Sequence, residues 1–291
     1  MATDTAAPSS PVTARPPVRR RSGRPARAGW TILAWLVGIV FFFPVLWMVL
    51  TSFKQERDAY TTTPRIIFSP TLDQYHAVFS GGIGTAAANS ALATVFSTLL
   101  VLVLAVPAAY ALSIRPVKRW RDGLFFFIGT KMLPIVAAIV PIFLVVRDIG
   151  ALDNIWTMAV LYAAMNLPIA VWMLRSFFLE VPRETLEAAR LDGAGVRQEL
   201  TEVMLPVVAP GVAATALICV IFSWNEFFFA LNLTATRAAT VPFFLVGFIT
   251  SEGPYWAQLA AATTLASLPV LLAGWIAQKQ LVRGLSMGAI K

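Results

Sequence analysis

The chain has 291 residues, of which 58% are hydrophobic and 13% are charged, and its mean hydropathy is +0.73. Because a water-soluble globular domain has charges on roughly a quarter of its residues, this composition excludes that class and places the protein in a lipid bilayer. The net charge of +8 is interleaved with long apolar runs and forms no basic face, so we expect lipid headgroups, and no nucleic acid, as its counter-ion.

The N-terminal segment is rich in Pro, Ala and Arg and lacks apolar periodicity, which predicts a disordered cytoplasmic tail over residues 1–29. The apolar run that follows is longer than the roughly 7–15 residues of a signal peptide core. It also lacks a small-residue cleavage site before Lys54. We therefore expect this run to remain as an uncleaved membrane anchor.

Long apolar stretches predict an all-α integral membrane domain over residues 30–291, because a membrane-spanning helix needs about 20 mostly apolar residues. Six transmembrane helices are expected. The third is interrupted by Lys131, and the fifth has Glu226 near its end. The predicted bounds of the six helices are 30–50, 86–113, 124–146, 154–174, 207–230 and 258–277.

The distribution of Lys and Arg orients these helices. An even number of spans places both termini on one side of the membrane, and loops rich in Lys and Arg stay in the cytoplasm. With the N-terminus in the cytoplasm, 17 basic residues lie inside and five outside, and Lys131 lies in the membrane. The sequence therefore predicts a multi-pass protein of the cell (inner or plasma) membrane with both termini cytoplasmic.

A charged segment lies between the fourth and fifth spans, where residues 175–206 hold six acidic and four basic residues. Strong helix formers over 184–191 are followed by Asp192-Gly193, a pair that tolerates positive φ and ends a helix. A second helix is expected beyond Gly193, with Glu199 on its polar face. Its apolar stripe recurs at helical spacing and consists of Val196, Leu200, Val203 and Met204.

Two short helices joined by a glycine turn predict a compact cytoplasmic structure. The alternative is an amphipathic hairpin that lies on the inner leaflet. That alternative is disfavoured because the polar face is net acidic, whereas anionic lipids attract Lys and Arg.

One motif in this segment has a characteristic spacing. Glu187-Ala188-Ala189 is followed by Gly193 six residues after the glutamate, and then by Leu205-Pro206. With this spacing, residues 180–206 resemble the EAA loop, by which permease subunits of ATP-binding-cassette importers dock onto their ATPase. The resemblance covers residues 30–291. Further stretches are similar to the sugar-importer branch of that family: Asn166-Leu167-Pro168, Arg175-Ser176-Phe177-Phe178, Ser223-Trp224-Asn225-Glu226-Phe227 and Val282-Arg283-Gly284-Leu285.

The resemblance implies a type I importer permease with six transmembrane helices and a cytoplasmic two-helix coupling loop. It implies a sugar or polyol as solute and three kinds of partner: a second permease in a heterodimer, two ATPase subunits and an extracytoplasmic solute-binding protein. ATP and Mg are expected on the partner ATPase, with no cofactor in this chain. The residues that the resemblance assigns to ATPase coupling are Glu187, Ala188, Ala189, Asp192, Gly193, Leu205 and Pro206.

Polar groups at membrane depth are candidates for function. Lys131 and Glu226 lie near opposite membrane surfaces, and snorkelling or helix capping also explains them. For Asn166, interhelical hydrogen bonding competes with a role in the solute path. Sugars suit aromatic faces together with amide and carboxyl groups, so the possible translocation path comprises Tyr162, Asn166, Trp224, Asn225 and Glu226.

Two other function classes are weighed against the importer. A membrane enzyme would need a catalytic pair or triad on one membrane side, and no Ser/His/Asp or Cys/His set meets this condition. The single Cys219 and His76 also exclude a disulfide framework and a His/Cys metal site. A secondary transporter would need several ionisable groups stacked through the membrane core, and Lys131 and Glu226, at opposite membrane surfaces, are too few. Because no Gly-x-x-x-x-Gly-Lys-Ser/Thr motif occurs, the energy source must bind to another chain.

Overall fold

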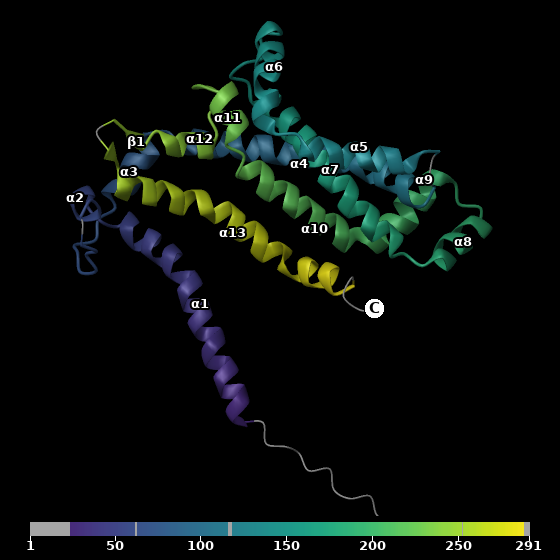
Figure 1. Ribbon diagram of the computed structural model, residues 1–291, viewed down its shortest axis with the longest axis horizontal. Helices are drawn as coiled ribbons and strands as arrows, with labels where there is room; N and C mark the ends of the chain where they lie inside the picture. Colours follow the sequence, from purple (N-terminus) through teal and green to yellow (C-terminus); the bar gives the residue numbers. More distant parts are fainter. Residues whose placement is uncertain (1–23, 62, 116–117, 252, 288–291) are drawn as a thin grey trace, which may run out of the picture. The chain divides into compact units, whose positions relative to one another are not determined.

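A computed structural model of the chain describes residues 24–61, 63–115, 118–251 and 253–287 (Figure 1). Of the tail predicted over residues 1–29, residues 1–23 lie outside the described residues. The chain divides into two compact units, residues 1–46 and 47–291. In chain order the elements are α1 Arg24–Ser52, α2 Glu56–Ala59, α3 Asp73–Ser80, α4 Ile83–Ser113, α5 Trp120–Met132, α6 Ile135–Asp148, α7 Ile155–Leu179, α8 Arg183–Leu191, α9 Val196–Gln198, the π-helical turn η1 Glu199–Met204, α10 Leu205–Trp224, α11 Phe228–Leu233, α12 Val241–Val246, β1 Ile249–Thr250, β2 Gly253–Pro254 and α13 Trp256–Met287.

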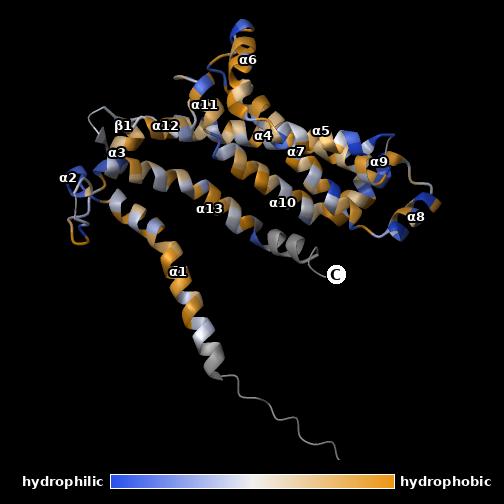
Figure 2. Ribbon diagram, viewed as in Figure 1, coloured by the Kyte–Doolittle hydropathy of each residue, from blue (hydrophilic) through white to orange (hydrophobic). Residues whose placement is uncertain are grey.

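Five helical stretches of the described chain are long and apolar enough to cross a membrane: Gly29–Ser52, Ile83–Ser113, Ile155–Leu179, Val196–Trp224 and Trp256–Ile276. The pair α5 and α6 passes the same test together, as a sixth span that is bent by 92°. The predicted all-α class with six spans is therefore confirmed. Figure 2 shows hydrophobic residues along these helices and hydrophilic residues gathered at α8 and α9.

The third predicted span, 124–146, is not one straight helix. It breaks between α5 and α6, where Leu133 has an extended backbone with φ of −69° and ψ of 128°. The cause is Pro134, because proline disfavours helical conformation in the residue before it and cannot donate a backbone hydrogen bond. Lys131 therefore lies in the last turn of α5, where its Nζ is 5.9 Å from the ring centroid of Phe222.

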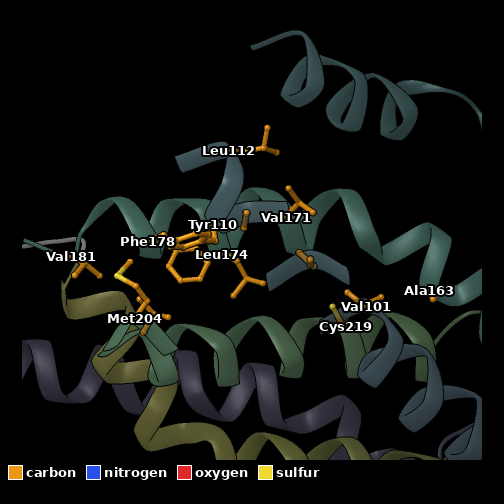
Figure 3. Packing of buried hydrophobic residues seen from close by; sticks show 14 of the residues in the cluster. Val101, Tyr110, Leu112, Ala163, Val171, Leu174, Phe178, Val181, Met204 and Cys219 are labelled. Atoms are coloured by element: carbon orange, nitrogen blue, oxygen red, sulfur yellow. The ribbon is translucent and has the colours of Figure 1, made fainter. Parts of the chain in front are cut away.

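The core of residues 47–291 forms where α4, α7 and α10 pack together. Figure 3 shows Val171 and Leu174 of α7 among the buried residues there, with Cys219 of α10 close by. The Tyr110 ring of α4 stands edge-on to Phe178 of α7, with ring centroids 6.0 Å apart. In lipid, such helices associate through van der Waals packing and interhelical hydrogen bonds.

At one position α10 approaches α7 too closely for any side chain. A Cβ atom added at Gly211 would lie 2.3 Å from Cγ of Phe177. Small residues at helix contacts allow this kind of close packing in membranes. The glycine therefore sets how near the fifth span lies to the fourth.

Asp153 joins two loops near the start of α7, the helix whose other end leads to α8. Its carboxylate accepts hydrogen bonds from the backbone N–H groups of residues 235–238, at 2.9 to 3.2 Å. Burial alone would raise the pKa of Asp153, but these four N–H groups outweigh it and hold the pKa well below its usual range. The carboxylate thus fixes the loop before α7 to the segment after α11.

Replacing Asp153 with Asn should loosen this junction. The amide keeps one acceptor oxygen and turns an N–H₂ group toward backbone donors, so we expect a loss of about 1–3 kcal/mol in unfolding free energy. Because the folded pKa is depressed, the contribution is complete above about pH 4 and is lost as the pH falls through the folded pKa. Thermal unfolding in detergent at neutral pH checks this, with Asp148→Asn as control, since Asp148 is exposed and pairs with neighbouring Arg147.

Candidate functional site

The segment that carries the Glu-Ala-Ala motif folds as a short helix with a well-defined end. α8 follows Pro182, whose φ of −57° suits a helix start. At its other end Gly193 has φ of +87°, the N–H of Gly193 bonds to Arg190 O and that of Ala194 bonds to Ala189 O. This pair of bonds is the Schellman motif, which favours glycine because its central residue is left-handed.

One face of α8 is open to solvent in the described chain. Glu184, Glu187 and Ala188 are exposed on it, whereas Leu186 on the other side is buried. Leu191, one turn beyond Glu187, is 88% exposed. Leu191 is not part of the Glu-Ala-Ala motif, although its spacing of four residues from Glu187 places it on the acidic face. The exposed face of α8 is therefore acidic, with Leu191 at its end.

The second helix of the loop is not a separate unit. α9 passes through η1 directly into α10, so helical backbone runs from Val196 to Trp224. The Leu205 N–H bonds to Leu200 O, five residues back, and Pro206 has no N–H to donate. Along the predicted apolar stripe, Met204 is fully buried but Val196 is 50% exposed. The loop and the fifth span therefore form one continuous helical arm.

Glu199 departs most from the sequence analysis, which placed it on a polar face. It is fully buried and accepts hydrogen bonds from three side chains. Arg190 of α8 binds both carboxylate oxygens, with Nη2–Oε1 at 2.8 Å and Nε–Oε2 at 3.0 Å. Arg115 Nη2 lies 3.0 Å from Oε2, and the Tyr110 hydroxyl donates to Oε1. No sequence pattern indicated this cluster, because Tyr110 and Arg115 lie more than eighty residues from Glu199 in the chain.

A cavity of about 410 Å³ lies under α8. It separates part of α8 from the ends of α4 and α7, and Ser113, Phe178, Val181, Glu187 and Arg190 are among its lining residues. The contact between α8 and the membrane helices is therefore not continuous. Leu186 also lines this cavity but is buried, and the cluster around Glu199 adds polar contacts.

Two of the predicted path residues lie on α7 and are buried by the chain's own helices. Asn166 Nδ2 donates to Ser223 Oγ at 2.9 Å, and Ser223 Oγ lies 3.0 Å from Ser97 Oγ. Tyr162, one turn earlier, packs with Met158 and Phe229. These contacts join α4, α7 and α10 inside one chain. A role for these residues in the solute path stays a prediction.

The other three predicted path residues lie where the fifth span ends. α10 stops at Trp224, and the Glu226 carboxylate accepts the N–H of Phe229 at 2.9 Å, at the start of α11. The indole N–H of Trp224 donates to Ala266 O at 3.1 Å. Trp224 and Asn225 line a cavity of about 300 Å³ bordered by α12 and α13. Their role toward solute also stays a prediction.

Comparison with known proteins identifies relatives over most of the chain. Residues 79–287 match the family model of the binding-protein-dependent transport system inner membrane component. A probable ABC transporter permease protein of Sinorhizobium fredii is 38% identical, with 90% of this chain and 95% of the relative covered. The trehalose transport system permease protein SugB of Mycobacterium tuberculosis is 34% identical, covering 90% and 97%. The trehalose/maltose transport system permease protein MalG of Thermococcus litoralis is 32% identical, covering 88% and 94%.

Solved structures agree with this relationship. A chain of a bacterial ABC transporter involved in the import of the acidic polysaccharide alginate aligns with a TM-score of 0.72 and 26% identity, covering 91% of this chain and 99% of that one. A chain of the MetNI methionine ABC transporter shares the fold, with a TM-score of 0.56, 17% identity and coverage of 72% and 97%. Since the family model matches more than half of the chain and the relatives align over nearly their whole length, this chain belongs to the binding-protein-dependent transport inner membrane family and is an importer permease, not an enzyme.

Proposed function

We propose that this permease forms, with a second and similar permease, the path by which a sugar or polyol crosses the membrane. ATP hydrolysis on two separate ATPase subunits drives the transport, and an extracytoplasmic binding protein delivers the solute. The observation that carries this proposal is the exposed face of α8 at the end of the helical arm that continues into α10. Relatives named for trehalose and maltose transport support the solute class.

In this proposal, α8 is the element that docks on the ATPase. Glu187 is exposed and makes charge-assisted contacts with a basic group there, while Ala188 permits close approach. Leu191 adds an apolar anchor beside them. Gly193 sets the angle between α8 and the arm through its left-handed backbone. Leu205 and Pro206 lie where the arm enters the membrane, so displacement of α8 reaches the fifth span.

The charge distribution supports a cytoplasmic position for α8 and for both termini. With this orientation the cytoplasmic segments hold 17 of the basic residues, against five outside. ATP and Mg bind to the ATPase, and this chain contributes no phosphate-binding loop. The energy of hydrolysis therefore enters this chain as movement of α8.

Reconstituted transport tests the proposal. Proteoliposomes that contain the two permeases and the two ATPase subunits should take up solute only under two conditions. ATP must be present on the ATPase side of the membrane, and binding protein must be present on the opposite side. Uptake that requires an ion gradient and continues unchanged after ATP depletion would identify a secondary transporter and overturn the proposal.

The solute class has its own test. Thermal-shift screening of the cognate binding protein against sugars, polyols, amino acids and peptides should give stabilisation by one or more sugars or polyols, because bound ligand stabilises the folded state by mass action. Stabilisation by amino acids or peptides alone would contradict the proposed solute class. It would not bear on ATP-driven transport, which the uptake experiment tests separately.

A further inference from the structure

We infer that Glu199 joins α8, the helical arm and the second span into one moving body, so that the stroke of the ATPase reaches α4 as well as α10. This inference rests on the docking role proposed above for α8. It assigns a positioning function to a residue that makes no contact with ATPase or solute, and it adds a second route of transmission that the backbone cannot supply.

The turn between α8 and the arm is shaped by its own backbone hydrogen bonds, but few side chains pack against it. Residues 192–195 contain Gly193 and Gly195, and a Cβ at Gly193 would meet no atom within 4 Å, so little packing restrains the turn. The bidentate pair between Arg190 and Glu199 bridges this turn, from the last turn of α8 to the start of η1. Two parallel hydrogen bonds fix orientation as well as distance, which a single ion pair does not.

The backbone does not carry a movement of α8 directly to α4, the second span, because α5, α6 and α7 lie between them in the chain. The cavity under α8 also removes direct packing over part of this interface. The Tyr110 hydroxyl and the Arg115 guanidinium fill the gap, since they donate to the carboxylate that Arg190 holds. One carboxylate therefore ties together the cytoplasmic end of α4, α8 and the arm.

Burial of the carboxylate strengthens this junction, while the Arg115 and Arg190 side chains that hold it are 44% and 42% exposed. Glu199 is fully buried, and a buried carboxylate is stable only while its oxygens are hydrogen-bonded. If α8 moved away alone, the carboxylate would lose its bidentate partner inside the protein. We therefore expect the segments to move together when the ATPase subunits close, and to separate when the charge at position 199 is removed.

The test compares Glu199→Gln with Glu202→Gln, an exposed glutamate in the same π-helical turn. In proteoliposomes with the whole complex, Glu199→Gln should keep ATPase co-purification and stimulated hydrolysis, while solute transported per ATP falls about tenfold, within the usual range of coupling energies. Glu202→Gln should behave as the unaltered chain. Equal transport per ATP in both variants would overturn the inference.

A second variant removes only the α4 side of the junction. Tyr110→Phe combined with Arg115→Gln leaves the Arg190 pair intact, so folding of the loop should persist while transport per ATP falls. Spin labels on cysteines introduced at Lys118 and Glu184 report the separation of the α4–α5 loop from α8; the native Cys219 is buried. The distance distribution should broaden in this variant and in Glu199→Gln. An unchanged narrow distribution, with unchanged transport per ATP, would overturn the inference.

The same experiment separates this inference from the proposed function. If the ATPase fails to associate with the unaltered chain, the docking role of α8 is wrong. If the unaltered complex associates and transports, but loss of the Glu199 charge changes neither coupling nor distance, then only the junction is wrong.

Discussion

Gly193→Val should strongly weaken coupling between the ATPase and the membrane helices while leaving the six spans inserted. The backbone at Gly193 has φ of +87°, a conformation that a β-branched residue adopts at a cost of about 1–3 kcal/mol. The Schellman bonds at the end of α8 depend on that conformation, so the angle of α8 changes when it is lost. If the free energy of ATPase binding falls by this amount, association becomes about 5- to 150-fold weaker.

The matched control is Gly195→Val. Gly195 lies two residues further along the same turn, but its φ of −74° and ψ of 168° are extended, and β-branched residues fit this conformation. ATPase co-purification and solute-stimulated hydrolysis should fall sharply for Val at 193 and little for Val at 195. Equal losses at both positions would show that bulk in the turn, and not backbone conformation, determines docking.

Gly211→Ala should have the largest effect on the membrane core. The new Cβ would lie 2.3 Å from Cγ of Phe177, a distance that no rotamer of alanine can relieve. Either the half-buried Phe177 ring must turn or α10 must move away from α7, and overpacking of this kind costs typically about 1–3 kcal/mol, occasionally more. Because α10 carries the helical arm, displaced packing should also lower transport.

Thermal unfolding in detergent measures this effect. Gly84→Ala is the control, because a Cβ at Gly84 of α4 would meet nothing within 4 Å. Adding Phe177→Leu to Gly211→Ala should restore part of the lost stability, since the two positions are in contact and their effects are not additive. If Gly211→Ala and Gly84→Ala unfold alike, the close approach of α7 and α10 is not as described.

The sequence alone was sufficient for the six apolar spans, since lipid demands long charge-free helices whatever their packing. It was also sufficient for the end of α8, because Asp192-Gly193 after strong helix formers is a local signal and the φ of Gly193 is positive. The break of the third span at Pro134 could have been expected from the proline, but prolines also occur inside unbroken helices of this chain, such as Pro107 in α4 and Pro168 in α7. Only tertiary packing decides between a kink and a break.

The surroundings of Glu199 and Glu226 could not be predicted from the sequence, because they depend on residues that meet only after folding. Glu199 looked like part of a solvated helix face, and its burial depends on Tyr110 and Arg115, more than eighty residues away. Glu226 looked like a charge inside the fifth span. It lies beyond the end of α10, where its carboxylate binds the first N–H groups of α11. Hydropathy cannot register such an interruption, because the residues on both sides of it are apolar.

Site-specific photo-crosslinking should show whether α8 is the surface on which the ATPase docks. A photoreactive amino acid is placed at Glu187 in the whole complex, and at Asp148, the exposed last residue of α6, as control (Figure 1 shows α6 and α8). We predict a crosslink to the ATPase from position 187 and none from position 148. A complex that transports solute and yet crosslinks to the ATPase from position 148, or not at all from position 187, would contradict docking on α8.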